Sequence, residues 1–99
     1  MNVTDIRIRR TYEDGKLKAL VSVTIDQDLA VHDIKVIEGS ERLFVAMPSR
    51  KDDNGVFRDI VHPITMEGRK TLEGLILDEY HKYLSQQEVY SENAEKSRW

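Results

Sequence analysis

Apolar and polar side chains alternate at the start of the chain, which is typical of a strand with one buried face. Ile6 and Ile8 fall on one face, and Arg7 and Arg9 fall on the other. Residues 13–16 follow as a turn, because their Asp-Gly pair supplies the positive φ that a tight hairpin needs. The pattern therefore predicts a first strand that returns through a hairpin.

Two further strands are predicted after this turn. Residues 17–25 alternate most regularly, with an apolar side chain at every second position. Residues 29–37 are rich in β-branched side chains, which favour strands, but their alternation breaks at His32 and Asp33. Such a break predicts a β-bulge, where one extra residue is inserted into the strand.

The middle of the chain is less regular. Residues 43–47 are apolar on both faces, which predicts a central strand or an interface strand. Pro48 ends this strand or places it at the edge of a sheet. Residues 49–55 are polar and include an Asn-Gly turn signal, so we expect a loop there. Residues 56–61 could return as a final strand, anchored by Phe57.

One long helix is predicted in the last third of the chain. Thr65 suits the N-cap, because its hydroxyl can accept a hydrogen bond from a free backbone N–H. Gly68 and Gly74 each weaken the helix by about 1 kcal/mol relative to alanine, and we expect the polar residues 86–99 to form a flexible tail. Apolar side chains recur at helical spacing at Leu72, Leu75, Ile76, Tyr80, Tyr83 and Leu84.

The order of these elements predicts the fold class. Hairpin-length connections pair strands antiparallel, and one amphipathic helix can cover one face of a sheet. We therefore expect a single α+β domain over residues 1–85, with an antiparallel sheet of four to five strands packed against one C-terminal amphipathic helix. A chain of 99 residues has a modest core, so a dimer would bury more apolar surface.

Composition narrows the class of protein. The chain has no cysteine, which excludes disulfides, thiolate metal sites and cysteine catalysis. It has neither an apolar signal segment nor an apolar run of the ~20 residues that span a membrane, so we expect a cytoplasmic protein without a membrane partner. No catalytic motif occurs, and the 3 histidines lack ligand spacing, so we expect no enzyme, metal or cofactor.

The net charge of −3 looks unfavourable for nucleic-acid binding, but it is unevenly distributed. Residues 1–70 carry 12 basic and 12 acidic side chains, whereas residues 71–99 carry 3 basic and 6 acidic ones. The excess negative charge therefore lies in the helix and the tail. Basic clusters elsewhere could contact phosphates, most effectively if an oligomer brought them together.

Two basic pairs are candidates for such contacts. Arg50 and Lys51 lie in the polar loop, where an arginine fork could grip a phosphate or a base edge; a solvated pair offset by the neighbouring aspartates is the alternative. Arg69 and Lys70 lie near the helix start, where free N–H groups favour anions; ordinary surface charge is the alternative.

A basic sheet face is a further candidate, since alternate residues of a strand share a face. The alternative is a solvated face with ion pairs to acids such as Asp5 or Asp59. The aromatic side chains fit core or interface positions rather than a platform for stacking bases. The residues of the candidate face are Arg7, Arg9, Lys18 and Arg58.

Three stretches of the chain together resemble one protein family. They are VHDIKVIEG at residues 31–39, LFVAMPSRK at residues 43–51 and GVFRDIVHPI at residues 55–64. With VTDIRIR at the start, they resemble the stage V sporulation protein G (SpoVG) family, and the resemblance covers residues 1–84.

This resemblance implies a bacterial cytoplasmic homodimer that binds DNA, and in some members RNA, and regulates genes. In spore-forming bacteria it implies a link to sporulation and to control of asymmetric septation. The family pattern keeps a basic pair directly after Met-Pro-Ser, which carries the binding role to Arg50 and Lys51. The alternative function is a protein–protein adaptor in cell division or sporulation, which the acidic helix and tail would suit.

Two sets of residues follow as predictions. The expected nucleic-acid contacts are Arg50, Lys51, Arg58, Arg69 and Lys70. The expected dimer or core contacts are Phe44, Val45, Met47, Leu72 and Ile76, for which a purely intramolecular core is the alternative.

Overall fold

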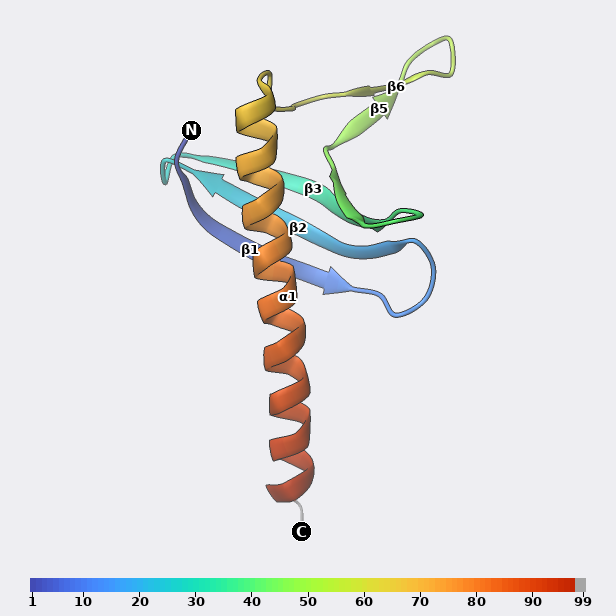
Figure 1. Cartoon of the computed structure of the whole chain (residues 1–99). Coiled ribbons are helices and arrows are strands. Elements are labelled where there is room, and N and C mark those ends of the chain that lie inside the picture. Colours follow the sequence, from blue (N-terminus) through green and yellow to red (C-terminus); the bar gives the residue numbers. More distant parts are fainter. Residues whose placement is uncertain (98–99) are drawn as a thin grey trace.

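The computed structural model describes residues 1–97, with side chains through residue 86, as a sheet crossed by one long helix (Figure 1). The predicted α+β class with one C-terminal helix is confirmed. The elements in chain order are β1 Val3–Thr11, β2 Leu17–Ile25, β3 Leu29–Glu38, β4 Leu43–Ala46, β5 Ser49–Lys51, β6 Phe57–Asp59 and α1 Met66–Ser97.

Strands β1 to β4 form one antiparallel sheet in the order β1-β2-β3-β4, so each strand pairs with its neighbour in sequence. The predicted first hairpin is confirmed, and Gly15 adopts the positive φ of 81° that its turn requires. In the next turn Asp26 and Gln27 both have positive φ, 53° and 61°. Such a turn matches the right-handed twist of the strands on either side.

The predicted bulge lies at His32 and Asp33. Val21 pairs with Ile34 and Val23 pairs with Val31, so Ser22 alone faces two residues of β3. Asp33 takes a φ of 62°, which absorbs the extra residue. The bulge lets Val31 and Ile34, three residues apart, both enter the core.

The core lies between the sheet and α1, which crosses one sheet face (Figure 1). Ile34 and Ile76 are fully buried, one from the central sheet and one from the helix. Leu75 is 40% exposed, so its place in the predicted apolar stripe was wrong. The buried apolar residues are Ala19, Val21, Val23, Val31, Ile34, Val36, Val45, Met47, Leu72, Ile76 and Tyr80.

The middle of the chain differs from the expected pattern in two places. β4 is an edge strand rather than a central one, so of the two predicted alternatives only the interface strand remains. Its apolar side chains divide between the faces, with Val45 in the core and Phe44 on the face away from α1. The expected loop at residues 49–55 begins as strand β5, which pairs with β6 in a separate two-stranded sheet.

The helix starts as predicted. The Thr65 hydroxyl accepts a hydrogen bond of 3.0 Å from the Gly68 backbone N–H, which makes Thr65 the N-cap. The backbone is helical as far as Ser97. The flexible tail expected over residues 86–99 stays a prediction, and residues 98–99 lie outside the described part of the chain.

Candidate nucleic-acid interface

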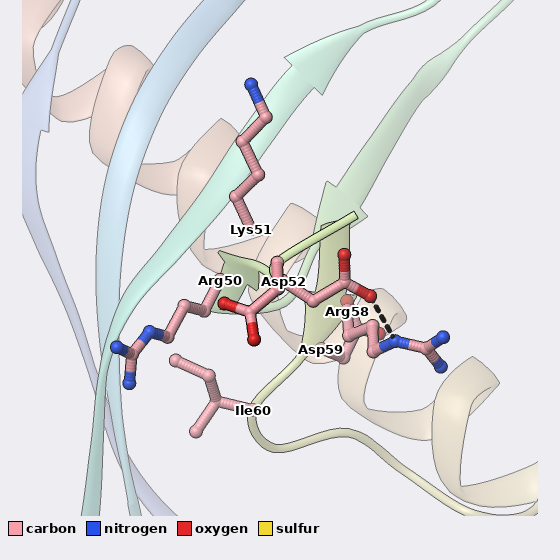
Figure 2. Close-up of a pocket in the computed structure, with 7 residues that line it drawn as sticks. Arg50, Lys51, Asp52, Arg58, Asp59 and Ile60 are labelled. Atoms are coloured by element: carbon pink, nitrogen blue, oxygen red, sulfur yellow. Dashed lines mark hydrogen bonds and ion pairs between the residues drawn. The ribbon is translucent and has the colours of Figure 1, made fainter. Parts of the chain in front are cut away.

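The small sheet of β5 and β6 carries three of the predicted basic residues. Arg50 lies directly opposite Arg58, and Lys51 lies opposite Phe57. Opposite residues of an antiparallel pair share a face, so the ribbon brings Arg50 and Arg58 together from positions eight residues apart. Figure 2 shows both arginines and Lys51 around the shallow depression that they line with Asp52, Asp53, Asp59 and Ile60.

Asp52 closes the turn of this ribbon. Its Oδ1 atom accepts hydrogen bonds of 2.9 Å from the backbone N–H groups of Asn54 and Val56. Gly55 has the positive φ of 82° that the tight turn needs. The Asn-Gly signal in the sequence therefore marks a real turn. The side-chain hydrogen bonds that stabilise this turn are accepted by Asp52, two residues before the asparagine.

The second oxygen of Asp52, Oδ2, accepts a hydrogen bond of 2.8 Å from the Nε of Arg58. This bond, followed by the bond from the Val56 N–H, lowers the pKa of Asp52 below its ordinary value of 3.8. Asp52 is therefore an anion at neutral pH whose charge is directed at the turn and at Arg58. The acid that pairs with Arg58 is thus Asp52, which the sequence analysis did not name among the possible partners.

Arg50 and Lys51 keep their charges available. Among the side chains that the structure describes, none forms a hydrogen bond or ion pair with Arg50, and the Lys51 ammonium lies 5.8 Å from the Phe57 ring centroid. In Figure 2 both side chains extend away from Asp52, while Arg58 reaches it. The aspartate that could have neutralised the basic pair is thus used inside the ribbon.

The second predicted basic pair lies at the start of α1. Arg69 and Lys70 line a different depression from the hairpin residues, together with Met66 and the Arg42–Glu73 ion pair of 2.8 Å. Glu73 is thereby engaged by Arg42. Within the described residues, neither Arg69 nor Lys70 makes a side-chain hydrogen bond or ion pair. This basic surface is thus separate from the one on the ribbon.

The predicted basic sheet face is only partly assembled. Arg7 pairs with Asp5 at 3.0 Å, as the ion-pair alternative expected. Lys18 turns to Glu38, at 3.5 Å, and Arg58 belongs to the other sheet. Of the four predicted residues, only Arg9 is on the four-stranded sheet without an ion pair among the described residues.

The three histidines lie apart and have structural partners. His32 bonds to the Ser22 hydroxyl, His62 bonds to the Pro63 carbonyl, and His81 packs on Tyr80. In the described part of the chain, no cluster of three or more His, Asp or Glu side chains is placed to hold a metal ion. No helix there combines the length and apolar character needed to cross a membrane.

Four of the five predicted dimer or core contacts are buried within the single chain. Val45, Met47, Leu72 and Ile76 are at most 7% exposed, whereas Phe44 is 37% exposed. Only Phe44 of this set can touch another molecule without opening the core. A dimer through these residues stays a prediction.

A run of exposed apolar residues that the sequence analysis did not identify as a surface extends from Val56, just before β6, to Met66 at the start of α1. Phe57 belongs to it and is 68% exposed, so its predicted role as an anchor was wrong. Each residue of the run is at least 37% exposed, and Ile64 and Met66 reach 89% and 79%. A signal was present, because Phe57, Ile60, Val61 and Ile64 recur at the i, i+3, i+4, i+7 spacing of an amphipathic helix, although the segment before Met66 is not helical. The residues are Val56, Phe57, Ile60, Val61, Ile64 and Met66.

These features define an α+β protein with a helix-covered antiparallel sheet and a basic two-stranded ribbon. The model of the SpoVG family matches residues 1–82, and the chain belongs to that family. It is 52% identical over 92 residues to "Putative septation protein SpoVG" of Clostridium botulinum (strain Eklund 17B / Type B), which covers 93% of this chain and 100% of the relative.

Two further relatives carry the same name. The protein of Clostridioides difficile (strain 630) is 54% identical over 92 residues, covering 93% of this chain and 100% of the relative. The protein of Clostridium perfringens (strain 13 / Type A) is 57% identical over 82 residues, covering 83% of this chain and 91% of the relative. The similarity therefore includes the sheet, the ribbon and the start of the helix.

Proposed function

We propose that this protein is a cytoplasmic regulator that binds nucleic acid, DNA and also RNA, through the β5–β6 ribbon. The observation that carries the proposal is the free state of Arg50 and Lys51 beside an aspartate whose oxygens are already bonded. An unpaired arginine offers a planar fork to a phosphate or a base edge. A lysine adds a mobile point charge.

The names of the relatives support a role in septation. We propose that the protein acts in sporulation and in the control of asymmetric septation through the genes that it binds. A protein of net charge −3 binds a polyanion through local surfaces rather than through its overall field. Affinity that falls steeply with salt is therefore expected.

We also infer that the protein is a homodimer. A hairpin with three-residue strands is marginally stable by itself, and it leads into the exposed apolar residues that end with Ile64 and Met66. A second copy of this segment is a partner of matching apolar chemistry, and pairing would bury both. A dimer would also double the basic ribbons available to one nucleic acid.

A mobility-shift and anisotropy comparison tests the binding. The variant Arg50→Ala/Lys51→Ala is compared with Lys16→Ala/Lys82→Ala, which removes the same charge from exposed positions outside the ribbon. We expect the first variant to lose at least tenfold in affinity and the control to change less than threefold. Equal affinities for both variants would remove the ribbon from the site.

The same experiment separates the two functions that the sequence left open. Wild-type protein that shifts no genomic DNA or RNA at micromolar concentration and physiological salt would contradict nucleic-acid binding and favour the adaptor function.

The homodimer is tested by comparing the sedimentation of the variant Ile60→Asp/Ile64→Asp with that of wild type. We expect wild-type dimer and variant monomer, and a monomeric wild type would contradict the inference.

A further inference from the structure

The face of the four-stranded sheet opposite α1 is exposed and basic. Arg7 lies opposite Ser22, and Arg10 and Lys35 flank Leu20, so the register places all five on this face. We propose that this face binds single-stranded nucleic acid, with phosphates on its arginines and lysine and bases over its apolar edge. The proposal rests on the proposed function and adds a second surface, separate from the ribbon.

A buried hydroxyl holds one of these arginines in place. The Nε of Arg9 donates a hydrogen bond of 3.2 Å to the Oγ of Ser22, which is only 6% exposed. The Ser22 hydroxyl also lies 2.8 Å from the Nδ1 of His32. A serine hydroxyl has one proton and two lone pairs, so it can bond to both side chains at once, and Ser22 is satisfied on both sides.

This arrangement leaves the outer part of Arg9 free. No described side chain pairs with its two terminal NH₂ groups, which form the fork that binds a phosphate with two parallel hydrogen bonds. Fixing Nε in advance reduces the side-chain entropy that is lost on binding. A solvated surface arginine would not need a nearly buried hydroxyl to orient it.

The sheet register spaces the other cations. Arg10 on β1 and Lys35 on β3 are separated by β2, which places their backbones about 10 Å apart. The Arg10 guanidinium lies 5.4 Å from the centroid of the Tyr12 ring, and Lys35 makes no side-chain bond to the described residues. A single strand that crosses β2 could therefore place phosphates on either side of Leu20.

Few carboxylates oppose these charges. Asp5 forms an ion pair of 3.0 Å with Arg7, so Arg7 is less available for a phosphate than the unpaired cations of this face. Asp33 is exposed at the bulge beside His32. Arg9, Arg10 and Lys35 remain without an ion pair among the described residues, so the face attracts anions although the chain as a whole is acidic.

The β4 side of the same face is apolar and aromatic. Phe44 is 37% exposed and lies opposite the half-buried Ile37. Gly39 lets the ring lie close, because a Cβ at that position would be 3.2 Å from the Phe44 Cδ1 atom. Cations beside an aromatic surface suit a single strand, which exposes both phosphates and base faces, better than a duplex, whose bases are stacked inside.

The test compares binding to an oligothymidylate of about 30 nucleotides over a salt series. The variant Arg9→Gln/Lys35→Gln is compared with Lys16→Gln/Lys82→Gln, which removes equal charge elsewhere. If the first double variant is unstable, Lys35→Gln alone is used, because that change disturbs no hydrogen bond of the described residues. We expect the double variant to make the slope of log K against log salt shallower by about 1.4, or about 0.7 for each lost phosphate contact. Phe44→Leu should weaken single-strand binding about tenfold.

The outcomes separate this proposal from the ribbon. If Arg50→Ala/Lys51→Ala loses binding while the sheet-face variant behaves like its control, the sheet face is overturned and the proposed function stands. Wild-type protein that binds no nucleic acid overturns both. The proposal is also overturned if the sheet-face variant changes only the sedimentation of the protein. It is likewise overturned if Phe44→Leu binds single strands as tightly as wild type does.

Discussion

The carboxylate of Asp52 lies 2.8 Å from the Nε of Arg58, while its other oxygen holds two backbone N–H groups of the turn. One side chain therefore shapes the ribbon and neutralises one of its arginines. Arg50, directly across the ribbon from Arg58, has no such partner in the described part of the chain. The two opposite arginines thus differ in availability because of a single aspartate.

Replacing this aspartate should strengthen nucleic-acid binding. Asp52→Asn keeps an oxygen that can accept the turn N–H groups, but it removes the anion that holds Arg58. We expect roughly three- to tenfold tighter binding and a salt slope steeper by about 0.9 on duplex DNA, because one more cation can reach a phosphate.

Asp53→Asn is the matched control for this change. It removes the same charge from the neighbouring position, which has no hydrogen bond to Arg58. Anisotropy titrations should show the larger gain for Asp52→Asn. A gain of equal size in both variants would mean that overall charge, rather than the release of Arg58, controls binding.

The same ion pair makes the ribbon sensitive to acid. The pKa of the Asp52 carboxyl is lowered in the folded protein, chiefly by the hydrogen bond from Arg58, from an ordinary value of 3.8. A lowered folded-state pKa stabilises the fold above the unfolded-state value, and this stabilisation is lost as pH falls through the lowered pKa. We expect the side-chain carboxyl carbon of Asp52, followed by NMR, to titrate below pH 3.8, and a midpoint at or above that value would contradict the pairing.

Local signals were enough to predict several parts of the fold. Broken alternation at His32 and Asp33 predicted the bulge, and a threonine before an apolar periodic segment predicted the N-cap. In both cases the cause lies within a few residues of the feature. The neighbouring order of the strands followed from short turns, which leave little choice of pairing.

Features that depend on distant contacts were not predictable in this way. The residues of β5 are polar and carry no alternation, and their pairing with β6 comes from the bonds that Asp52 makes across the turn. The pattern of β4 left a central strand and an interface strand open, because a sequence pattern cannot distinguish a side chain in the core, such as Val45, from one on an open face, such as Phe44. The free state of Arg50 likewise depends on where Asp52 points.

The two glycines of α1 should respond differently to substitution. A Cβ at Gly74 would meet no atom within 4 Å, so Gly74→Ala should stabilise the protein by about 1 kcal/mol through helix propensity. A Cβ at Gly68 would lie 3.0 Å from the Thr65 hydroxyl oxygen that caps the helix. We expect Gly68→Ala to gain less than half as much in chemical denaturation, and equal gains would show that the cap adjusts freely.

The last prediction concerns the helix face that meets the sheet. Ile76 is fully buried, whereas its neighbour Leu75 is 40% exposed. Substituting each by alanine therefore compares the loss of core packing at Ile76 with a change at a partly exposed position of the same helix turn. Ile76→Ala should lower the free energy of unfolding by about 2–5 kcal/mol, because a cavity is left against the sheet. Leu75→Ala should cost less than half as much in the same denaturant titration, because the Leu75 side chain is already partly in water and less apolar surface is lost from the core. Similar losses for the two variants would mean that Leu75 is covered in solution, and sedimentation of Leu75→Ala would then show whether a second copy of the chain covers it.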